Sequence, residues 1–180
     1  MKTKKKIILG VTGSIAAHKA ADLASLLTKA RCDVRVVLTA DAQRFITPLP
    51  FKTLTRNPVV TDLYDEDEEW KPVHIELADA ADVLVIAPAT ANVLAKLAHG
   101  LADDALSCIA LALNPRAKIL IAPAMNGKMW LHAATRENVQ TWKQRGAVFI
   151  GPDEGMLSCG YEGLGRLWPV DQIAEHVLKL

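Results

Sequence analysis

The chain has 180 residues, a length that predicts one domain able to bury a full hydrophobic core without disulfides. Its formal net charge is +1 and only 5% of its residues are aromatic, so neither a basic surface for phosphates nor a set of rings for stacking bases is indicated, and nucleic-acid binding is not expected. Because no apolar run approaches the roughly 18 residues of a membrane-spanning helix, we expect no membrane partner.

The three cysteines point to a reducing, cytoplasmic environment. Cys32, Cys108 and Cys159 are odd in number and far apart, which argues against a disulfide framework. No CxxC or HExxH motif occurs and no histidine pair has ligand spacing, so we expect no metal site. The hydrophobic content of 51% is high for a single soluble domain and favours a buried subunit interface.

The chain opens with a strand, a glycine turn and a helix. Residues 5–11 predict the strand, Thr12-Gly13-Ser14 the turn, and residues 15–30 the helix, with Ser14 as its N-cap. Such a turn is either an anion site or simply a tight connection. Residues 33–39 predict the second strand, which ends at Thr39 and not at the acid that a dinucleotide site would place there, so a mononucleotide is favoured over NAD.

The next stretch carries weaker signals. Residues 41–45 look helical, Pro48 and Pro50 are expected to break that helix, and residues 59–64 read as a short extended piece. The acidic run at 65–69 predicts a solvated loop. A short helix over 72–80 carries His74, and a lone histidine after a proline is more often structural than catalytic.

Two buried strands end in nearly the same way. Residues 83–92 read VLVIAPATAN and residues 119–126 read ILIAPAMN, each an apolar run that stops at Ala-Pro-Ala and an asparagine. The runs show no polar alternation, which predicts strands covered on both faces, as in a parallel sheet. Open parallel sheets bind ligands beyond the carboxyl ends of their strands, so we expect Asn92, Asn126 and their small neighbours on the floor of an active site.

The alternation of elements predicts the fold class. Helices over 90–99, 103–113, 133–145 and 171–180, with a strand over 147–151, complete a doubly wound parallel α/β sheet, a Rossmann-like or flavodoxin-like three-layer sandwich. Residues 151–168 contain five glycines and a proline, which argues against a regular element there. We expect this segment to be a mobile lid over bound ligand.

Several stretches together resemble the homo-oligomeric flavin-containing cysteine decarboxylases. VTGSIAA at 11–17 resembles the family's flavin-phosphate turn, VHIELA at 73–78 carries its catalytic histidine, and PATAN at 88–92 is similar to its Pro-Ala-Ser-Ala-Asn-Thr motif. PAMNGKMW at 123–130 fits Pro-x-Met-Asn-x-x-Met-Trp at every fixed place, and LSCGYEGLGR at 157–166 resembles the substrate clamp with its reactive cysteine. Thr90, Val93 and Ser158 depart from the usual Ser, Thr and Ala, and Val93 removes a polar group expected near the flavin.

The resemblance implies one flavin-binding decarboxylase domain over 1–180 with a glycine-rich substrate clamp at 151–168. The implied activity is FMN-dependent decarboxylation of 4'-phosphopantothenoylcysteine to 4'-phosphopantetheine in coenzyme A biosynthesis, by oxidation to a thioaldehyde, loss of CO2 and re-reduction of the enethiol. It implies His74 as general base, Asn126 as the partner of the substrate carboxylate and Cys159 as proton donor. The implied FMN contacts are Gly13, Ser14, Ile15, Thr39, Thr90, Ala91, Asn92, Val93 and Ala124. The implied substrate contacts are Asn126, Met156, Leu157, Ser158 and Arg166.

The resemblance also implies a homotrimer or a dodecamer of trimers, in which His74 serves a neighbour's flavin. Three other functions stay open. A peptide decarboxylase acting on a C-terminal cysteine would not need Cys159, and a non-catalytic binder of a phosphatase subunit would not need His74, Asn126 and Cys159 intact. A prenylated-flavin synthase would have a similar first turn but no need of PAMNGKMW.

Overall fold

The computed structural model describes residues 4–64, 72–158, 160 and 162–180. A six-stranded parallel sheet forms its centre, with strands β1 (Lys6–Val11), β2 (Asp33–Leu38), β3 (Val59–Val60), β4 (Val83–Ala89), β5 (Lys118–Pro123) and β6 (Val148–Phe149). The strand order is β3-β2-β1-β4-β5-β6, the order of dinucleotide-binding sheets. The predicted doubly wound parallel sheet is therefore confirmed.

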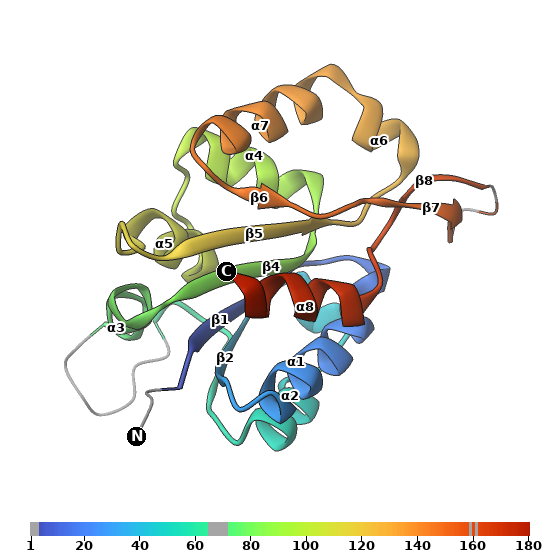
Figure 1. The fold of residues 1–180 in the computed structure, drawn as a ribbon. Helices are drawn as coiled ribbons and strands as arrows, with labels where there is room; N and C mark the ends of the chain where they lie inside the picture. Colours follow the sequence, from blue (N-terminus) through green and yellow to red (C-terminus); the bar gives the residue numbers. More distant parts are fainter. Residues whose placement is uncertain (1–3, 65–71, 159, 161) are drawn as a thin grey trace.

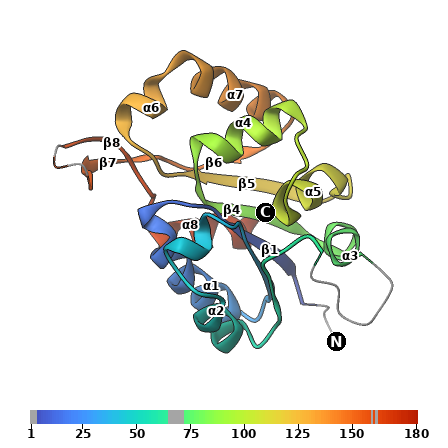
Figure 2. The same ribbon diagram turned by 180° about the vertical axis from the view of Figure 1, so that it is seen from behind.

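Helices cover both faces of the sheet (Figure 1, Figure 2). One face packs against α1 (Lys19–Lys29), α2 (Pro48–Thr55) and α8 (Val170–Lys179). The other face packs against α3 (Val73–Ala80), α4 (Ala91–His99), α5 (Ala105–Ala112) and α7 (Ala133–Gln144). Shorter helical turns, η1 (Ile15–His18), η2 (Ala42–Arg44) and α6 (Gly127–Leu131), follow β1, β2 and β5. Among the helices of the described ranges, none is long and apolar enough to cross a membrane.

The inner strands of the sheet are buried on both faces because their side chains alternate between two hydrophobic cores. Ile7 and Leu9 of β1 belong to the core under α1 and α8, whereas Ile8 belongs to the core under α4 and α5. All three are at most 1% exposed. This double burial explains why the strands lack the polar alternation of a half-exposed sheet.

The two prolines at 48 and 50 separate two helical segments, as expected. The helix expected over 41–45 ends before Pro48, since η2 covers Ala42–Arg44, and a second helix, α2, begins at Pro48 and runs through both prolines. The prolines are compatible with α2 because they lie in its first turn, where backbone N–H groups have no acceptor within the helix and a fixed φ suits the start.

The glycine-rich segment 151–168 corrects one expectation. It forms an antiparallel ribbon of β7 (Asp153–Met156) and β8 (Glu162–Arg166), which extends away from the sandwich (Figure 1). Gly155 lies opposite Gly163 in this ribbon, and Gly155 adopts a φ of +149°, a backbone conformation that L side chains rarely adopt. The glycines thus permit the ribbon's local geometry and do not prevent strand pairing. The acidic run at 65–69 lies outside the described residues.

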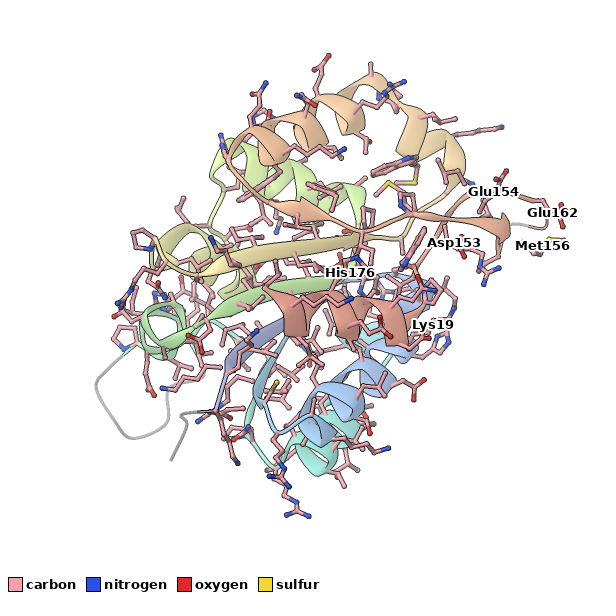
Figure 3. The ribbon with its side chains drawn as sticks, viewed as in Figure 1. Lys19, Asp153, Glu154, Met156, Glu162 and His176 are labelled. Carbon is pink, nitrogen blue, oxygen red and sulfur yellow. The ribbon has the colours of Figure 1, made fainter. Side chains whose placement is uncertain are left out.

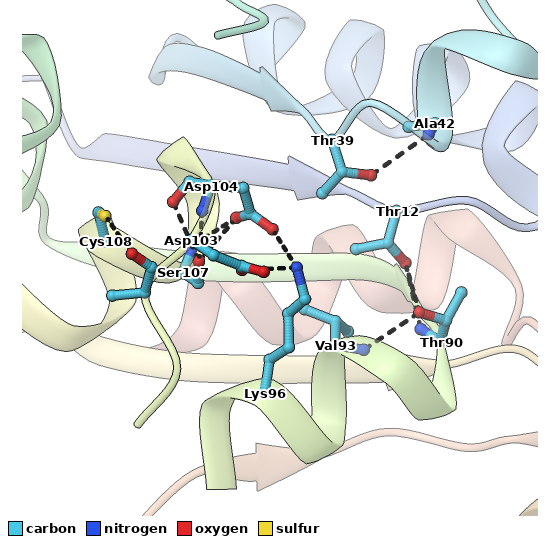
Figure 4. Close-up of polar contacts among 11 residues, drawn as sticks. Thr12, Thr39, Ala42, Thr90, Val93, Lys96, Asp103, Asp104, Ser107 and Cys108 are labelled. Atoms are coloured by element: carbon cyan, nitrogen blue, oxygen red, sulfur yellow. Dashed lines mark hydrogen bonds and ion pairs between the residues drawn. The ribbon is translucent and has the colours of Figure 1, made fainter. Parts of the chain in front are cut away.

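An ion-pair cluster fixes the connection between α4 and α5 (Figure 4). The Lys96 ammonium lies 2.6 Å from Asp103 and 2.9 Å from Asp104. Asp104 is also the N-cap of α5, since its carboxylate accepts the Ser107 N–H at 2.8 Å. Burial raises the pKa of the Asp104 carboxyl, but the hydrogen bonds from Ser107 and Lys96 outweigh burial and hold that pKa below its usual range.

Replacing Asp104 by alanine is expected to lower the free energy of unfolding by about 1–2 kcal/mol, since the cap and the inner ion pair are both lost. Asp103→Ala is the matched control: it removes a carboxylate that is 64% exposed and caps nothing, so its cost should stay below about 1 kcal/mol. Urea unfolding measures both.

The Asp104 effect should also depend on pH. A carboxyl whose pKa is lowered by folding stabilises the protein above its unfolded-state pKa of about 3.9 and loses that contribution as the pH falls through the lower folded-state value. The difference between wild type and Asp104→Ala should therefore be full at neutral pH and shrink below about pH 4. A difference that grows on acidification would contradict the assigned ion pair.

Candidate active site

A cavity of about 630 Å³ opens at the carboxyl edge of the sheet, a volume in the range of small-molecule and cofactor sites. Its walls come from the segments that follow β1, β4 and β5 and from the β7–β8 ribbon. The structure brings together most of the residues expected at the site: Gly13, Ser14, Ile15, Thr90, Ala91, Asn92, Ala124, Asn126, Met156, Leu157, Ser158 and Arg166 all line this cavity.

The turn after β1 supplies one wall. Ser14 is the N-cap of η1, and its hydroxyl accepts the Ala16 N–H at 3.3 Å. The turn is closed by a hydrogen bond from the Ser14 N–H to the Thr12 carbonyl at 2.8 Å. A Cβ at Gly13 would collide with the Cβ of Asp41, so only glycine allows this turn to lie against the segment after β2.

The segment after β4 supplies the adjoining wall. Thr90 caps α4 by accepting the Val93 N–H at 3.3 Å, and Ala91 and Asn92 follow it along the cavity. Val93 does not line the cavity: its side chain is 3% exposed and packs in the core beneath α4. The departure from threonine at this position therefore affects core packing and not the cavity wall.

Thr39 also lies outside the cavity lining. It directly follows β2, and its hydroxyl accepts the N–H of Ala42, the first residue of η2, at 3.2 Å (Figure 4). Thr39 and Val93 were both expected to contact the flavin, but neither of them lines the cavity.

The segment after β5 carries Asn126 on the third wall. Its side-chain oxygen accepts the Lys128 N–H at 2.8 Å, which makes Asn126 the N-cap of α6 as well as a lining residue. The preceding Ala124 is tied to β4 by its N–H, which donates to the Ala89 carbonyl at 3.0 Å. Because the side chain of Ala124 is small, it takes up little of the cavity volume beside the backbone.

The β7–β8 ribbon contacts the Asn126 turn directly. The Met125 N–H donates to the Gly165 carbonyl at 3.0 Å, and a Cβ at Gly165 would collide with the Met125 carbonyl oxygen. A Cβ at Gly127 would likewise lie 2.7 Å from the Leu164 carbonyl oxygen. The ribbon thereby places Leu157 and Arg166 over the cavity. Cys159, the expected proton donor, lies outside the described residues.

His74 is not brought to this cavity. It lies in the first turn of α3, and α3 is at the opposite end of the sheet from the β7–β8 ribbon in both views (Figure 1, Figure 2). Its Nδ1 atom is buried without a hydrogen-bond partner among the described residues. Within one copy of the chain, His74 is therefore not among the residues that line the cavity.

Other lining residues were not expected from the sequence: His18, Lys19, Asp41, Met125 and Met129. Figure 3 shows Lys19 and Met156 at the same end of the sheet. Lys19 and Arg166 carry positive charge against one carboxylate, that of Asp41, so positive charge prevails in the lining. The helical start after Gly13 was the available signal for His18 and Lys19, since residues in the first turns of a helix lie beside its N-terminus.

The lining fits a flavin. The glycine turn and the cationic side chains suit a phosphate, Ala91 and Ala124 leave space beside backbone for a planar ring, and Leu157 and Met129 add apolar surface. A metal is less well served: among the described residues, no group of three His, Cys, Asp or Glu side chains is placed to hold one.

Comparisons with known proteins agree with this fit. The "Flavoprotein" family model matches residues 1–180. The "Coenzyme A biosynthesis bifunctional protein CoaBC" of Bacillus subtilis is 44% identical over 180 residues, which are 100% of this chain and 43% of that protein. A "Probable phosphopantothenoylcysteine decarboxylase" of Streptococcus mutans is 44% identical over 173 residues, 96% of this chain and 97% of that protein. The chain thus spans less than half the length of the Bacillus relative and nearly all of the Streptococcus one.

Solved structures are similar over almost the whole chain. A PPC decarboxylase mutant complexed with pantothenoylaminoethenethiol has a TM-score of 0.88 and 33% identity, with 98% of each chain covered. "The FMN binding protein AtHal3" has a TM-score of 0.85 and 33% identity, with 98% of this chain and 96% of that chain covered. Because the family model matches every residue and a relative of equal length is 44% identical, the chain belongs to the flavoprotein family.

Proposed function

We propose that this protein is an FMN-dependent decarboxylase of 4'-phosphopantothenoylcysteine that forms 4'-phosphopantetheine for coenzyme A. The observation that carries the proposal is the cavity, which gathers the glycine turn, the two Ala-Pro-Ala strand ends and the ribbon into one site in a member of the flavoprotein family. The Streptococcus relative of equal length carries the same activity in its name, and AtHal3 is named for binding FMN.

FMN would supply the two-electron chemistry that activates the cysteinyl carbon and later restores the thiol. Gly13, Ser14 and Ile15 would hold its phosphate at the start of η1, and Ala91 and Ala124 would lie beside its ring. The net positive lining supports an anionic cofactor and an anionic substrate in one cavity.

Asn126 would bind the substrate carboxylate. A neutral amide can donate to a carboxylate without stabilising its charge as strongly as a lysine would, and excessive ground-state stabilisation would oppose loss of CO2. Arg166 and the neighbouring ribbon residues Met156, Leu157 and Ser158 would contact the rest of the substrate. Cys159 would protonate the product carbon, a role proposed from the sequence alone.

His74 would act from a second copy of the chain. Its distance from the cavity of its own chain, on α3 at the far end of the sheet, supports an arrangement in which α3 of one subunit lies over the cavity of the next (Figure 2). Such a head-to-tail contact closes into a ring, so a homotrimer, alone or grouped into a dodecamer, meets the requirement. The three separate cysteines favour the reducing cytoplasm as its location.

The function is tested by reconstituting the purified protein with FMN and measuring CO2 release. We expect release from 4'-phosphopantothenoylcysteine and little from a peptide that ends in cysteine. Release from the peptide alone would instead indicate a peptide decarboxylase, and FMN uptake without release from either would indicate a flavin-binding protein without this activity.

Asn126→Asp should separate capping from catalysis. Aspartate caps a helix as well as asparagine, so the free energy of unfolding should change by less than about 0.5 kcal/mol. The rate of CO2 release should fall by at least about a hundredfold, because the donor is replaced by an anion facing the substrate carboxylate. FMN content is the control, and a variant that binds FMN and decarboxylates at the wild-type rate would refute the role of Asn126.

A mixing experiment should test whether His74 acts between subunits. His74→Asn and Asn126→Asp are each expected to be inactive when assembled alone. Unfolded together and refolded as mixed oligomers, they should regain roughly a quarter of the wild-type activity, since random assembly in a ring pairs an intact cavity with an intact neighbouring histidine in that fraction of sites. Mixed oligomers without activity would mean that His74 serves its own chain, and His74→Asn that is active when assembled alone would mean that His74 has no catalytic role.

A further inference from the structure

Thr12 is a buried polar residue between the two central strand ends. It directly follows β1, and it is 2% exposed although it borders the cavity-lining turn that begins at Gly13. Its hydroxyl donates to the Pro88 carbonyl at 2.7 Å. The same hydroxyl accepts the Thr90 N–H at 3.1 Å, and Figure 4 shows Thr12 beside Thr90. One oxygen therefore satisfies two backbone groups that lie 76 and 78 residues further along the chain.

The position of this hydroxyl corresponds to the end of the β1–β4 ladder. The two strands pair in register from Ile7 and Val83 as far as Gly10 and Ile86, and pairing stops there. Beyond that point β4 continues beside β5, where Ala89 pairs with Pro123 after a shift in register. Thr12 supplies by its side chain the donor and the acceptor that β1 no longer offers by its backbone.

We propose that Thr12 is a positioning residue for the flavin, a role that rests on the proposed FMN-dependent function. Its hydroxyl holds the phosphate turn at 13–15 at a fixed distance from the ring-binding segment at 90–92. Thr90 is in turn the N-cap of α4, because its hydroxyl accepts the Val93 N–H. The position of Thr90 therefore fixes the positions of Ala91 and Asn92, the first residues of α4. A cofactor that must reach both segments at once depends on this spacing, although Thr12 itself does not line the cavity.

Thr12→Val tests the role, because valine keeps the shape of threonine and loses the hydroxyl's hydrogen bonds to the Pro88 carbonyl, the Thr90 N–H and the Thr90 hydroxyl. The full chain, stripped of flavin, is titrated with FMN and followed by quenching of flavin fluorescence. We expect the FMN dissociation constant to rise at least about tenfold, the effect expected when a buried backbone group loses its partner. Thr12→Ser, which keeps the hydroxyl, should stay within about threefold of wild type.

Thr55→Val is the matched control. Thr55 is also buried, and its hydroxyl likewise donates to a backbone carbonyl, that of Phe51, and accepts a backbone N–H, that of Asn57. It lies in α2, away from the cavity lining, so its loss should destabilise the fold and leave FMN affinity unchanged. Equal FMN affinity in wild type and Thr12→Val, or equal losses in Thr12→Val and Thr55→Val, would overturn the proposal.

Riboflavin gives a second readout that a purely structural role would not move. It lacks the phosphate, so it does not need the two segments at a fixed spacing, and Thr12→Val should lower the ratio of the riboflavin dissociation constant to the FMN dissociation constant.

If Thr12→Val does not fold, amide hydrogen exchange of the wild-type chain decides: the Thr90 amide must be protected, and free exchange would overturn the proposal. Wild-type protein that takes up no FMN would contradict the proposed function, and the role of Thr12 with it. Uptake that is equal in Thr12→Val would contradict only the role of Thr12.

Discussion

The adjacency of β1 and β4 at the centre of the sheet is the constraint on which the site depends. The chain leaves β1 toward α1 on one face and leaves β4 toward α4 on the other, so the two connections diverge above neighbouring strand ends. Divergence of this kind leaves a crevice at the carboxyl edge of the sheet. The cavity occupies that edge, and three of its walls are the segments that follow β1, β4 and β5.

The electrostatic character of the site is local. The whole chain is close to neutral, with a formal charge of +1, yet Lys19 and Arg166 meet a single carboxylate around the cavity. Backbone groups at the start of η1 add to this positive character, and Met156 and Leu157 add apolar surface to the lining. The cavity is therefore suited to an anionic ligand with a flat apolar body because of the side chains and backbone groups around it. The net charge of the whole protein would not indicate this.

Sequence patterns were sufficient for the sheet and for most of the cavity, because buried strands and the turns that end them are local properties. The runs that end at Ala89 and Pro123 show this directly. Thr39 and Val93 do not line the cavity, because a side chain's direction depends on how the following helix begins: Thr39 accepts a backbone N–H of η2 and Val93 packs in the core. His74 could not be placed from sequence, since its distance from the cavity is set by the packing of α3 and, in the proposed ring, by another subunit.

The glycine-rich ribbon shows a limit of composition as a guide. Its glycines argued for an irregular segment, but several occupy positions that strand pairing or close packing requires. Whether a glycine interrupts a strand or permits it depends on what lies opposite, and that information is tertiary.

The contact between Gly165 and the Met125 carbonyl also limits how the shape of the cavity can change. Main chain meets main chain there, with no side chain between them that could be exchanged for a longer or shorter one. The height of the cavity on that side is consequently insensitive to gradual substitution. Accommodating a bulkier ligand there would need a different loop length or a different backbone path. This wall is therefore the part of the cavity that side-chain substitutions change least.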